Sequence, residues 1–446
     1  MAILDCAQMM EPHWKWDCVP FVSQSYDRGD EFQEFGLKWH GFGFNTVTAP
    51  GWKIKGGKTL DQIPMRHFAG VATIIDLSDV VGAISKDDLL ARLQARPARD
   101  LIVLKTRHAD RIYHRHATYW KNAPQITPDC ARLIAERGYK HVAVDFPCDS
   151  VPALRPNGEG AIHNFNETFR CMVHTQGMVL TENCENFSAI EQDEVFFVSL
   201  PIAMPATGSA PSRPIALTQW RSEQPKITDI STPFLNHWRW KLDIWTGGTL
   251  ARGDEREEQH FLLAGHGFTH CDAPRHMERT GATINEMPNR GLDVFIRDAH
   301  LIDFSDLNLP QPITKAMMAE RCKKVKTGEH VILRSDLTNK LGYPSREWHL
   351  QAPNIEEEAA KWLAERGVSA VCLDFPQDYV ARQMPYRHVK NEEFVAHHAI
   401  FANGIPFIED LKDLGTLSTK TPFILAVPLK MTCVDGAPMR VVAVEW

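Results

Sequence analysis

The sequence has no long apolar run and no block of basic residues. No stretch approaches the ~18 apolar residues that a membrane-spanning helix needs. The formal net charge is -7, so neither nucleic acid nor an anionic membrane is expected as the main partner. Residues 1–8 lack the basic segment and the apolar core of a secretory signal. We therefore expect a cytoplasmic protein.

Cysteine pairs and a serine-hydrolase motif are also missing. The ten cysteines form no C-x-x-C pair, and a chain of 446 residues is far longer than a disulfide-rich scaffold. We expect reduced thiols, most of them buried. The absence of a G-x-S-x-G segment argues against the nucleophilic serine of an α/β-hydrolase. With 43% hydrophobic and 24% charged residues, the composition is typical of a globular enzyme with two or more domains.

The first half of the chain recurs in the second half. Six segments match in the same order, at an offset that stays between 224 and 229 residues. The matching pairs are 13–16 with 237–240, 73–78 with 300–305, 101–105 with 330–334, 135–138 with 364–367, 144–147 with 373–376 and 209–213 with 436–440. This period is too long for a solenoid. The sequence predicts a tandem duplication with a boundary in the polar stretch 219–226, giving domains 1–222 and 223–446.

Each half is predicted to be mixed α/β. Residues 127–138 are typical of a helix, with Thr127 as N-cap, Pro128 in the first turn and Gly138 as the stop. Residues 354–367 follow the same plan, and a late helix is expected at 391–402. The expected strands are 101–105, 141–146, 331–334, 368–375, 423–427 and 440–444.

Four ligand-type residues of the second half lie within eleven positions: His266, His270, Asp272 and His276. The Gly and Pro residues among them disfavour a regular helix, so we expect a strand that runs into a turn at Pro274. On a strand, His266, His270 and Asp272 would point to the same side. Two imidazoles and a carboxylate suit Zn(II) or Mn(II). After the turn, His276 would approach from another angle.

This run resembles the H-x-G-T-H-x-D-x-P-x-H signature of the cyclase superfamily, which includes bacterial kynurenine formamidase, isatin hydrolase and trans-dienelactone hydrolase. The resemblance extends through residues 229–233 and 436–440 and so covers the second half. It implies two tandem cyclase-like α/β domains of the swivelling β/β/α type. One residue departs from the signature: Phe268 stands where the family has Gly, and we expect it to reshape the strand or the pocket wall.

The resemblance also implies a role for each site residue. The ligands would be His266, His270, Asp272, His397 and Glu409. They would hold one or two divalent ions, Zn(II) or Mn(II), with Asp272 as the bridge between two. His276 would shuttle the proton while metal-activated water opens an amide, a cyclic amide or imide, or a lactone. Two alternatives stay open: a metal-assisted cyclase or dehydratase, and a non-catalytic small-molecule binder.

The first half has lost this site. The residues that align with the five ligands and with His276 are Phe42, Thr46, Thr48, Arg170, Glu182 and Trp52. Threonine, phenylalanine and tryptophan cannot build a Zn(II) or Mn(II) cage. We hypothesise an intramolecular pseudo-dimer that is free to oligomerise further. In it the degenerate first half is scaffold and pocket wall, with Trp14, Trp16 and Trp52 as candidate lining residues for a small, aromatic or cyclic substrate.

Overall fold

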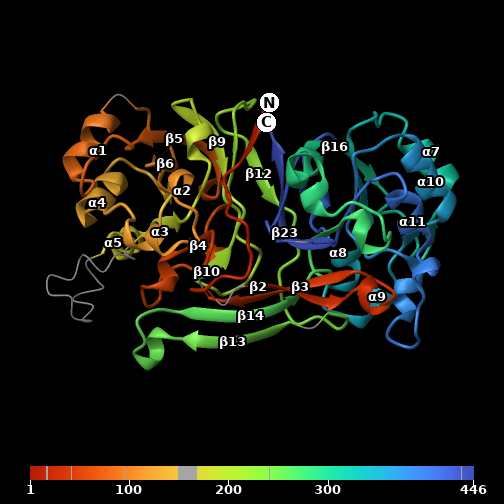
Figure 1. Ribbon diagram of the computed structural model, residues 1–446. Coiled ribbons are helices and arrows are strands. Elements are labelled where there is room, and N and C mark those ends of the chain that lie inside the picture. The colour runs from red at the N-terminus through yellow and green to blue at the C-terminus, as the bar shows by residue number, and fades with distance from the viewer. Residues whose placement is uncertain (17–18, 42, 95, 149–167, 241, 433) are drawn as a thin grey trace. The chain divides into compact units, whose positions relative to one another are not determined.

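The computed structural model describes residues 1–16, 19–41, 43–94, 96–148, 168–240, 242–432 and 434–446. The chain forms two compact units, each with its own sheet and helices (Figure 1). The first unit comprises Met1–Cys18, Trp39–Gln224 and Ile244–Phe261, and the second comprises Val19–Lys38, Pro225–Asp243 and Leu262–Trp446. Each unit therefore contains one segment from the other half of the sequence.

The first unit is built on a nine-stranded mixed sheet in which β5, β6, β7 and β8 run parallel. The strands in spatial order are β1 (Ile3–Asp5), β11 (Ile215–Leu217), β9 (Glu194–Val198), β5 (Ala69–Asp76), β6 (Leu101–Lys105), β7 (His141–Val144), β8 (Val179–Thr181), β4 (Thr46–Thr48) and β10 (Ser209–Pro211). The helices are α1 (Lys86–Leu93), α2 (His108–Arg111), α3 (Ala117–Lys121), α4 (Pro128–Glu136) and α5 (Phe169–Thr175).

Strand β6 shows that this sheet is buried on both faces. Ile102 and Leu104 belong to the hydrophobic cluster that includes residues of α1 and α4, whereas Leu101 and Val103 belong to the cluster on the opposite face. Side chains on a strand alternate between its faces, so a strand covered on both sides is apolar throughout. Helices α1 and α4 lie on one side of β5 and β6 (Figure 1).

The second unit is built on an eight-stranded sheet that closes on itself, because β22 also pairs with β23. The strands in spatial order are β12 (Lys226–Asp229), β23 (Gly436–Glu445), β15 (His270–Asp272), β21 (Phe407–Glu409), β20 (Ala370–Leu373), β18 (His330–Arg334), β16 (Ile296–Asp303) and β22 (Phe423–Pro428). The remaining strands of the chain are β2 (Val19–Gln24), β3 (Glu34–His40), β13 (Asp243–Gly248), β14 (Glu258–Ala264), β17 (Pro312–Ile313) and β19 (Asn354–Ile355).

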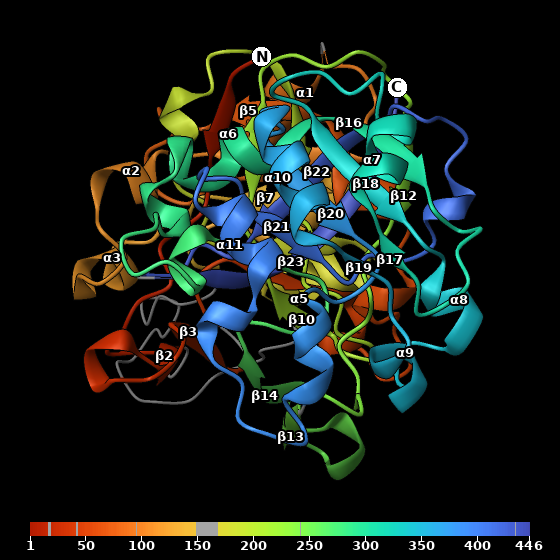
Figure 2. The same ribbon diagram turned by 90° about the vertical axis from the view of Figure 1, so that its right-hand side faces the viewer.

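Helices cover one face of the second sheet. They are α6 (Leu292–Phe295), α7 (Lys315–Arg321), α8 (Leu337–Leu341), α9 (Arg346–Leu350), α10 (Glu357–Glu365) and α11 (Val395–Phe401). Helices α7, α10 and α11 lie over β18, β20 and β21 (Figure 2). The sequence segment 19–38 also belongs to this unit, where β2 pairs antiparallel with β3.

Two helices predicted from the repeat differ in how they begin. Helix α4 starts at Pro128 after Thr127, as expected, and Gly138 follows its end with a φ of 93°. Helix α10 starts later than expected, because residues 354–355 form strand β19 and Glu356 is the N-cap. Ile355 is buried and pairs with Ile313 of β17. This tertiary pairing outweighs the local helix propensity.

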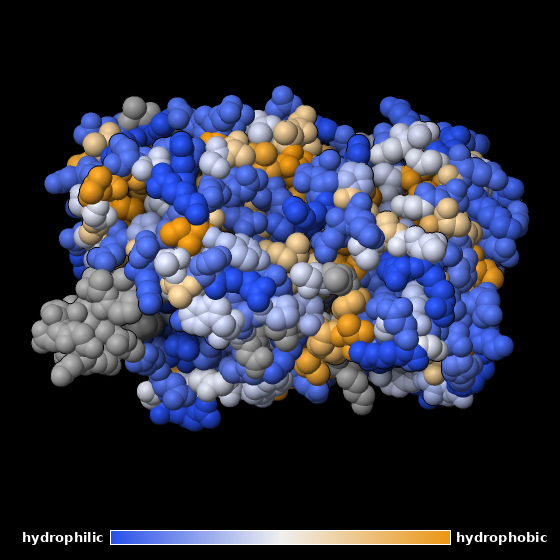
Figure 3. All heavy atoms as spheres, viewed as in Figure 1, coloured by the Kyte–Doolittle hydropathy of each residue, from blue (hydrophilic) through white to orange (hydrophobic). Residues whose placement is uncertain are grey.

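The face shown in Figure 3 is mostly hydrophilic and the described cysteines are buried, as the composition predicts. Apolar residues form small separate patches on this face. Among the described residues, no helix has both the length and the apolar character needed to cross a membrane. The eight cysteines in the described part of the chain are buried, and none of them pairs with another in a disulfide. The expectation of buried thiols therefore holds for these eight.

Both units contain the same ion pair between their first strand and their C-terminal motif. In the first unit, Arg213 Nη2 donates to Asp5 Oδ2 at 2.9 Å, and both side chains are buried. In the second unit, Arg440 Nη2 donates to Asp229 Oδ2 at 2.7 Å, and the Asp229 side chain is 24% exposed. The pairs occupy matching positions of the repeat and join its two ends.

We predict that Asp5→Ala destabilises the first unit by about 3 kcal/mol or more, because it removes the carboxylate that faces the buried Arg213 guanidinium. The matched variant Asp229→Ala should cost less, since water reaches that carboxylate. Denaturant unfolding followed by circular dichroism measures both. Equal shifts of the two midpoints would contradict the assignment of the larger effect to burial.

Candidate metal centre

The run from His266 to His276 is only partly extended. Strand β15 begins at His270, and the residues before it form a bend in which Gly267 has a φ of 145° and Phe268 a φ of 60°. The strand predicted across the whole run is therefore wrong before His270, because positive φ values break an extended chain. Pro274–His276 form a single 3-10 turn, so the predicted turn at Pro274 is present.

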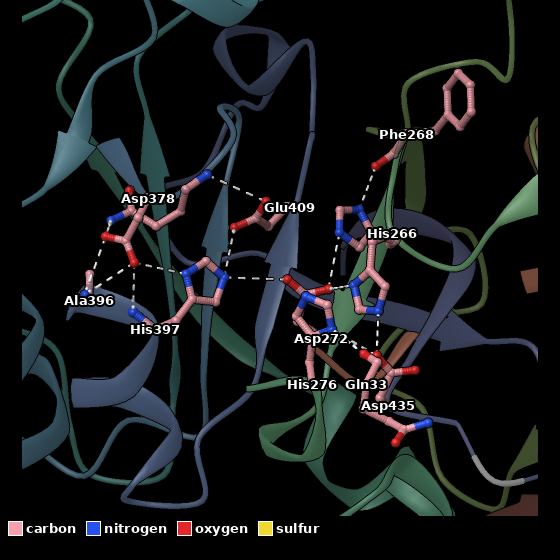
Figure 4. A network of polar contacts seen from close by, with 12 residues as sticks. Gln33, His266, Phe268, Asp272, His276, Asp378, Ala396, His397, Glu409 and Asp435 are labelled. Atoms are coloured by element: carbon pink, nitrogen blue, oxygen red, sulfur yellow. Dashed lines mark hydrogen bonds and ion pairs between the residues drawn. The ribbon is translucent and has the colours of Figure 1, made fainter. Parts of the chain in front are cut away.

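Phe268 occupies the left-handed conformation that glycine adopts most easily. This conformation costs a non-glycine residue roughly 1–2 kcal/mol. The ring is 2% exposed and packs on Phe234, with ring centroids 4.8 Å apart, which offsets that cost. It points away from the ligand cluster (Figure 4) and is not among the residues that line the pocket. We expected Phe268 to reshape the strand or the pocket wall: the chain does bend at this residue, whereas its ring does not line the pocket. Its carbonyl accepts a hydrogen bond from His270 Nδ1 at 2.8 Å.

The five predicted ligands converge around Asp272. Asp272 Oδ1 lies 2.6 Å from His266 Nδ1 and 3.1 Å from His270 Nε2. Asp272 Oδ2 lies 3.5 Å from Nε2 of His397, on helix α11. Glu409 is directly opposite His270 in the pairing of β21 with β15, and its Oε1 lies 3.8 Å from His397 Nε2. Each oxygen of Asp272 thus faces one group of potential ligands, the arrangement that a bridging carboxylate requires.

A sixth side chain, Asp378, orients His397. Its carboxylate accepts hydrogen bonds from the backbone N–H groups of Ala396 and His397 and from His397 Nδ1, the last at 3.0 Å. Holding Nδ1 as a donor leaves Nε2 of His397 free to face Asp272, and such outer hydrogen bonds are characteristic of metal-bound histidines. No local sequence pattern marks Asp378, which lies nineteen residues before His397.

Asp435 anchors His266 and His276 together. Its Oδ2 lies 2.7 Å from His266 Nε2 and 2.8 Å from His276 Nδ1, and the two rings stack with centroids 3.6 Å apart. His276 Nδ1 also donates to the carbonyl of Gln33 at 2.7 Å. Sequence reasoning missed Asp435, although it directly precedes the matched segment 436–440 and aligns with Gly208 in the first half.

The electrostatics of the cluster fit a bound cation. Burial and the charge of Asp272 raise the pKa of Glu409 to about 8, and its Oε1 accepts no hydrogen bond from the described residues. Burial opposes ionisation of Asp272, but His270 and His266 hold its pKa well below the usual range. A buried carboxylate oxygen without a partner is costly. A divalent ion among these imidazoles and carboxylates would satisfy it, and such donors suit Zn(II) or Mn(II).

The described residues also contain a second possible ligand group, formed by His266, His276 and Asp435. Asp435 already accepts hydrogen bonds at both oxygens, because its Oδ1 receives the backbone N–H of Phe35 at 3.2 Å. It therefore serves better as an anchor for the two rings. The group around Asp272 has the unsatisfied oxygen and is the stronger candidate.

A pocket of about 520 Å³ opens onto the cluster. Besides the predicted site residues, its lining includes Gln24, Phe32 and Glu34 from the segment 19–38 of the second unit. The three expected tryptophans do not line it: Trp14 is 61% exposed, and Trp16 and Trp52 are buried in the first unit. The first half of the sequence does contribute to the pocket, but through residues that sequence reasoning did not single out.

In the first unit, an arginine occupies the place of a metal ligand. Arg170, which aligns with His397, donates to both carboxylate oxygens of Glu182 at 2.9 and 2.7 Å. Thr46 uses its hydroxyl to donate to the carbonyl of Gly43. Trp52 packs beside Arg170, whose guanidinium lies 5.6 Å from the ring centroid. The guanidinium of Arg170 thus balances the charge of the buried Glu182, and no metal ion is needed there. Phe42 lies outside the described residues.

The comparisons with known proteins agree with the fold and the motif. A sequence profile of the cyclase family matches residues 40–148 and 204–377, more than half of the chain. The chain belongs to the cyclase family. The two tandem cyclase-like α/β domains expected from the sequence are confirmed, because the profile matches in both halves and each unit is mixed α/β.

Individual relatives align with about half of the chain. It is similar to the kynurenine formamidase of Bacillus cereus, with 26% identity over 223 residues that span 48% of this chain and 95% of the relative. The kynurenine formamidase of Salinibacter ruber is 29% identical over 206 residues, 44% of this chain and 84% of its own. Among solved structures, isatin hydrolase A from Ralstonia solanacearum covers 50% of this chain and 92% of its own, at 20% identity and a TM-score of 0.43.

We predict that His270→Ala lowers the divalent metal content of the purified protein, because it removes one ligand at the bend. The matched variant Thr46→Ala, at the aligned position of the first unit, should keep the wild-type content. Elemental analysis by plasma mass spectrometry gives the number of ions per chain. A parallel loss in both variants would contradict a metal site confined to the second unit.

Proposed function

We propose that this protein is a metal-dependent hydrolase that cleaves an amide, a cyclic amide or imide, or a lactone. The observation that carries the proposal is the convergence of three histidines and two carboxylates around Asp272, with His276 beside them at the same pocket. Membership of the cyclase family and the kynurenine formamidases among the relatives support hydrolysis of a carbon–nitrogen bond.

The proposed ligands are His266, His270, Asp272, His397 and Glu409. A bound Zn(II) or Mn(II) ion would lower the pKa of a coordinated water towards ~7 and polarise the substrate carbonyl. The pairing of Glu409 and His270 on neighbouring strands of the closed sheet supports this assignment. The ligand orientation comes from Phe268 and Asp378, which hold the Nδ1 atoms of His270 and His397.

His276 is the residue that we assign to proton transfer. Its Nδ1–H points to Asp435 and to the carbonyl of Gln33, so Nε2 is the nitrogen available to accept a proton. A carboxylate behind the ring stabilises the imidazolium that forms, as in other histidine–aspartate pairs. Hydrolysis adds the water oxygen to the carbonyl carbon and breaks the bond to the leaving nitrogen or oxygen. His276 takes the water proton and returns it to that leaving atom.

We also propose that the chain works as an intramolecular pseudo-dimer, in which the first half supports the site of the second. Tyr26 donates its hydroxyl to the carbonyl of His276 at 2.8 Å, and Phe35 donates its backbone N–H to Asp435. These residues lie in the first half of the sequence but belong to the second unit. They contact His276 and Asp435 directly, and they reach the proposed ligand His266 only through Asp435.

We predict that His276→Ala retains metal but loses turnover by about 10²- to 10⁴-fold, the range expected for a lost general acid–base. Formanilides, cyclic amides and lactones are the substrates to screen, and mass spectrometry should show a product heavier by one water. A product of lower mass than its substrate would favour a dehydratase. Normal turnover in the variant would remove His276 from the reaction.

A fragment that starts at residue 226 should be inactive, because it lacks the Gln33 carbonyl and the Phe35 N–H that hold His276 and Asp435. Its activity is measured beside the full chain on any substrate found in the screen. The matched full-length variant Trp14→Ala, altered at an exposed residue of the first half, should keep full activity. Wild-type activity in the fragment would contradict the proposed role of the first half.

A further inference from the structure

Arg239 is a cation on the pocket wall that no part of the proposed reaction uses. It is the one lysine or arginine among the described residues that line the pocket. It follows β12 in the second unit, within the segment 237–240 that repeats 13–16. The aligned residue of the first unit, Lys15, places its Nζ 4.9 Å from the ring centroid of Trp120.

The guanidinium of Arg239 has no carboxylate partner within ion-pair distance among the described residues. Its Nη2 lies 3.4 Å from Met384 Sδ, a weak acceptor. Burial lowers the pKa of Arg239, and the charge of Glu34 partly opposes that shift. Glu34 itself accepts a hydrogen bond from Gln24 Nε2 at 2.7 Å. A half-buried guanidinium is therefore left with most of its five donors free to bind a ligand.

The rest of the lining indicates what kind of ligand would fit. Phe32, Trp240, Met277, Met384 and Phe394 make much of the wall apolar. The acidic side chains of the pocket are Glu34, Asp272 and Glu409. A single arginine in such an acidic pocket matches one negative charge better than the two of a phosphate. The planar fork of a guanidinium also binds a carboxylate through two parallel hydrogen bonds.

We propose that Arg239 binds a carboxylate of the substrate, and that the substrates are amides with an apolar body and one carboxylate distant from the cleaved bond. The proposal rests on the proposed hydrolase function and adds the substrate class. Arg239 binds substrate and takes no part in proton transfer. Its contribution is the same before and during the reaction, so its loss raises KM and leaves kcat nearly unchanged.

The test compares para-formamidophenylacetate with its methyl ester, in which a methyl group replaces the negative charge. The wild-type protein should prefer the acid. Arg239→Gln should lower kcat/KM for the acid about 10- to 100-fold, mainly through KM, as expected for a lost charge-assisted hydrogen bond. The ester should change less than about threefold. A loss of the same size on both substrates, or no wild-type preference for the acid, would overturn the proposal.

Two further variants control the comparison. Arg239→Lys keeps the charge but not the fork, so its loss on the acid should be smaller than that of Arg239→Gln. Lys15→Gln, at the aligned position of the first unit, should leave both substrates unaffected. A loss on the acid in Lys15→Gln equal to that in Arg239→Gln would show a general effect of net charge and overturn the assignment.

A binding measurement separates failure of this proposal from failure of the hydrolase function. If the wild type cleaves neither compound, the proposed hydrolysis fails for this class, but calorimetry with phenylacetate still tests Arg239. Binding by the metal-loaded wild type that weakens about tenfold or more in Arg239→Gln supports the carboxylate site. Equal binding by the two proteins, or none by the wild type, overturns it.

Discussion

Asp272, Glu409 and Asp435 are three carboxylates buried in the second unit, so any charge on them has to be balanced by neighbouring groups. Histidines supply part of the balance, because Asp272 and Asp435 both contact the His266 ring. The attraction of these two carboxylates outweighs the effect of burial and raises the pKa of His266 well above its usual value. Glu409 keeps one oxygen without a partner in the described part of the chain. A further positive charge beside Glu409 and Asp272 would stabilise these buried carboxylates, and the surrounding structure depends on this requirement.

The first unit meets the same demand with different side chains. It keeps the buried glutamate at the aligned position, Glu182, and places the guanidinium of Arg170 against it. The backbone is retained: Phe44 and Phe268 both have positive φ, and a 3-10 turn starts at Pro50 as it does at Pro274. An ion pair with two hydrogen bonds needs no bound ion. The two halves thus share the backbone of the site. The second half has residues that suit a metal ion, whereas the first half has the Arg170–Glu182 ion pair.

The segment 19–38 connects the first half of the sequence to the site in the second unit. It comes early in the sequence but is part of the second unit, where Gln33 and Phe35 contact His276 and Asp435. In the proposed pseudo-dimer, a first half without its own ligand set would still be needed, because this segment contacts His276 and Asp435. The same segment contributes Phe32 and Glu34 to the pocket beside Arg239. Substitutions in this segment would alter the substrate that the pocket accepts without changing the proposed metal ligands.

The sequence by itself determined the duplication, the α/β class, the family and the five ligand-type residues that converge around Asp272. The duplication follows from six matched segments, and His266, His270 and Asp272 follow from their spacing within the run 266–276. His397 and Glu409 follow from the family resemblance, and the helices from capping and stop residues such as Thr127 and Gly138. Only the tertiary structure decided the parts that join distant segments. Asp435, Asp378 and the segment 19–38 meet the histidines through the order of strands in a closed sheet, which no local pattern specifies. The direction of the Phe268 ring likewise depended on a positive φ and on the aromatic neighbours that stabilise it.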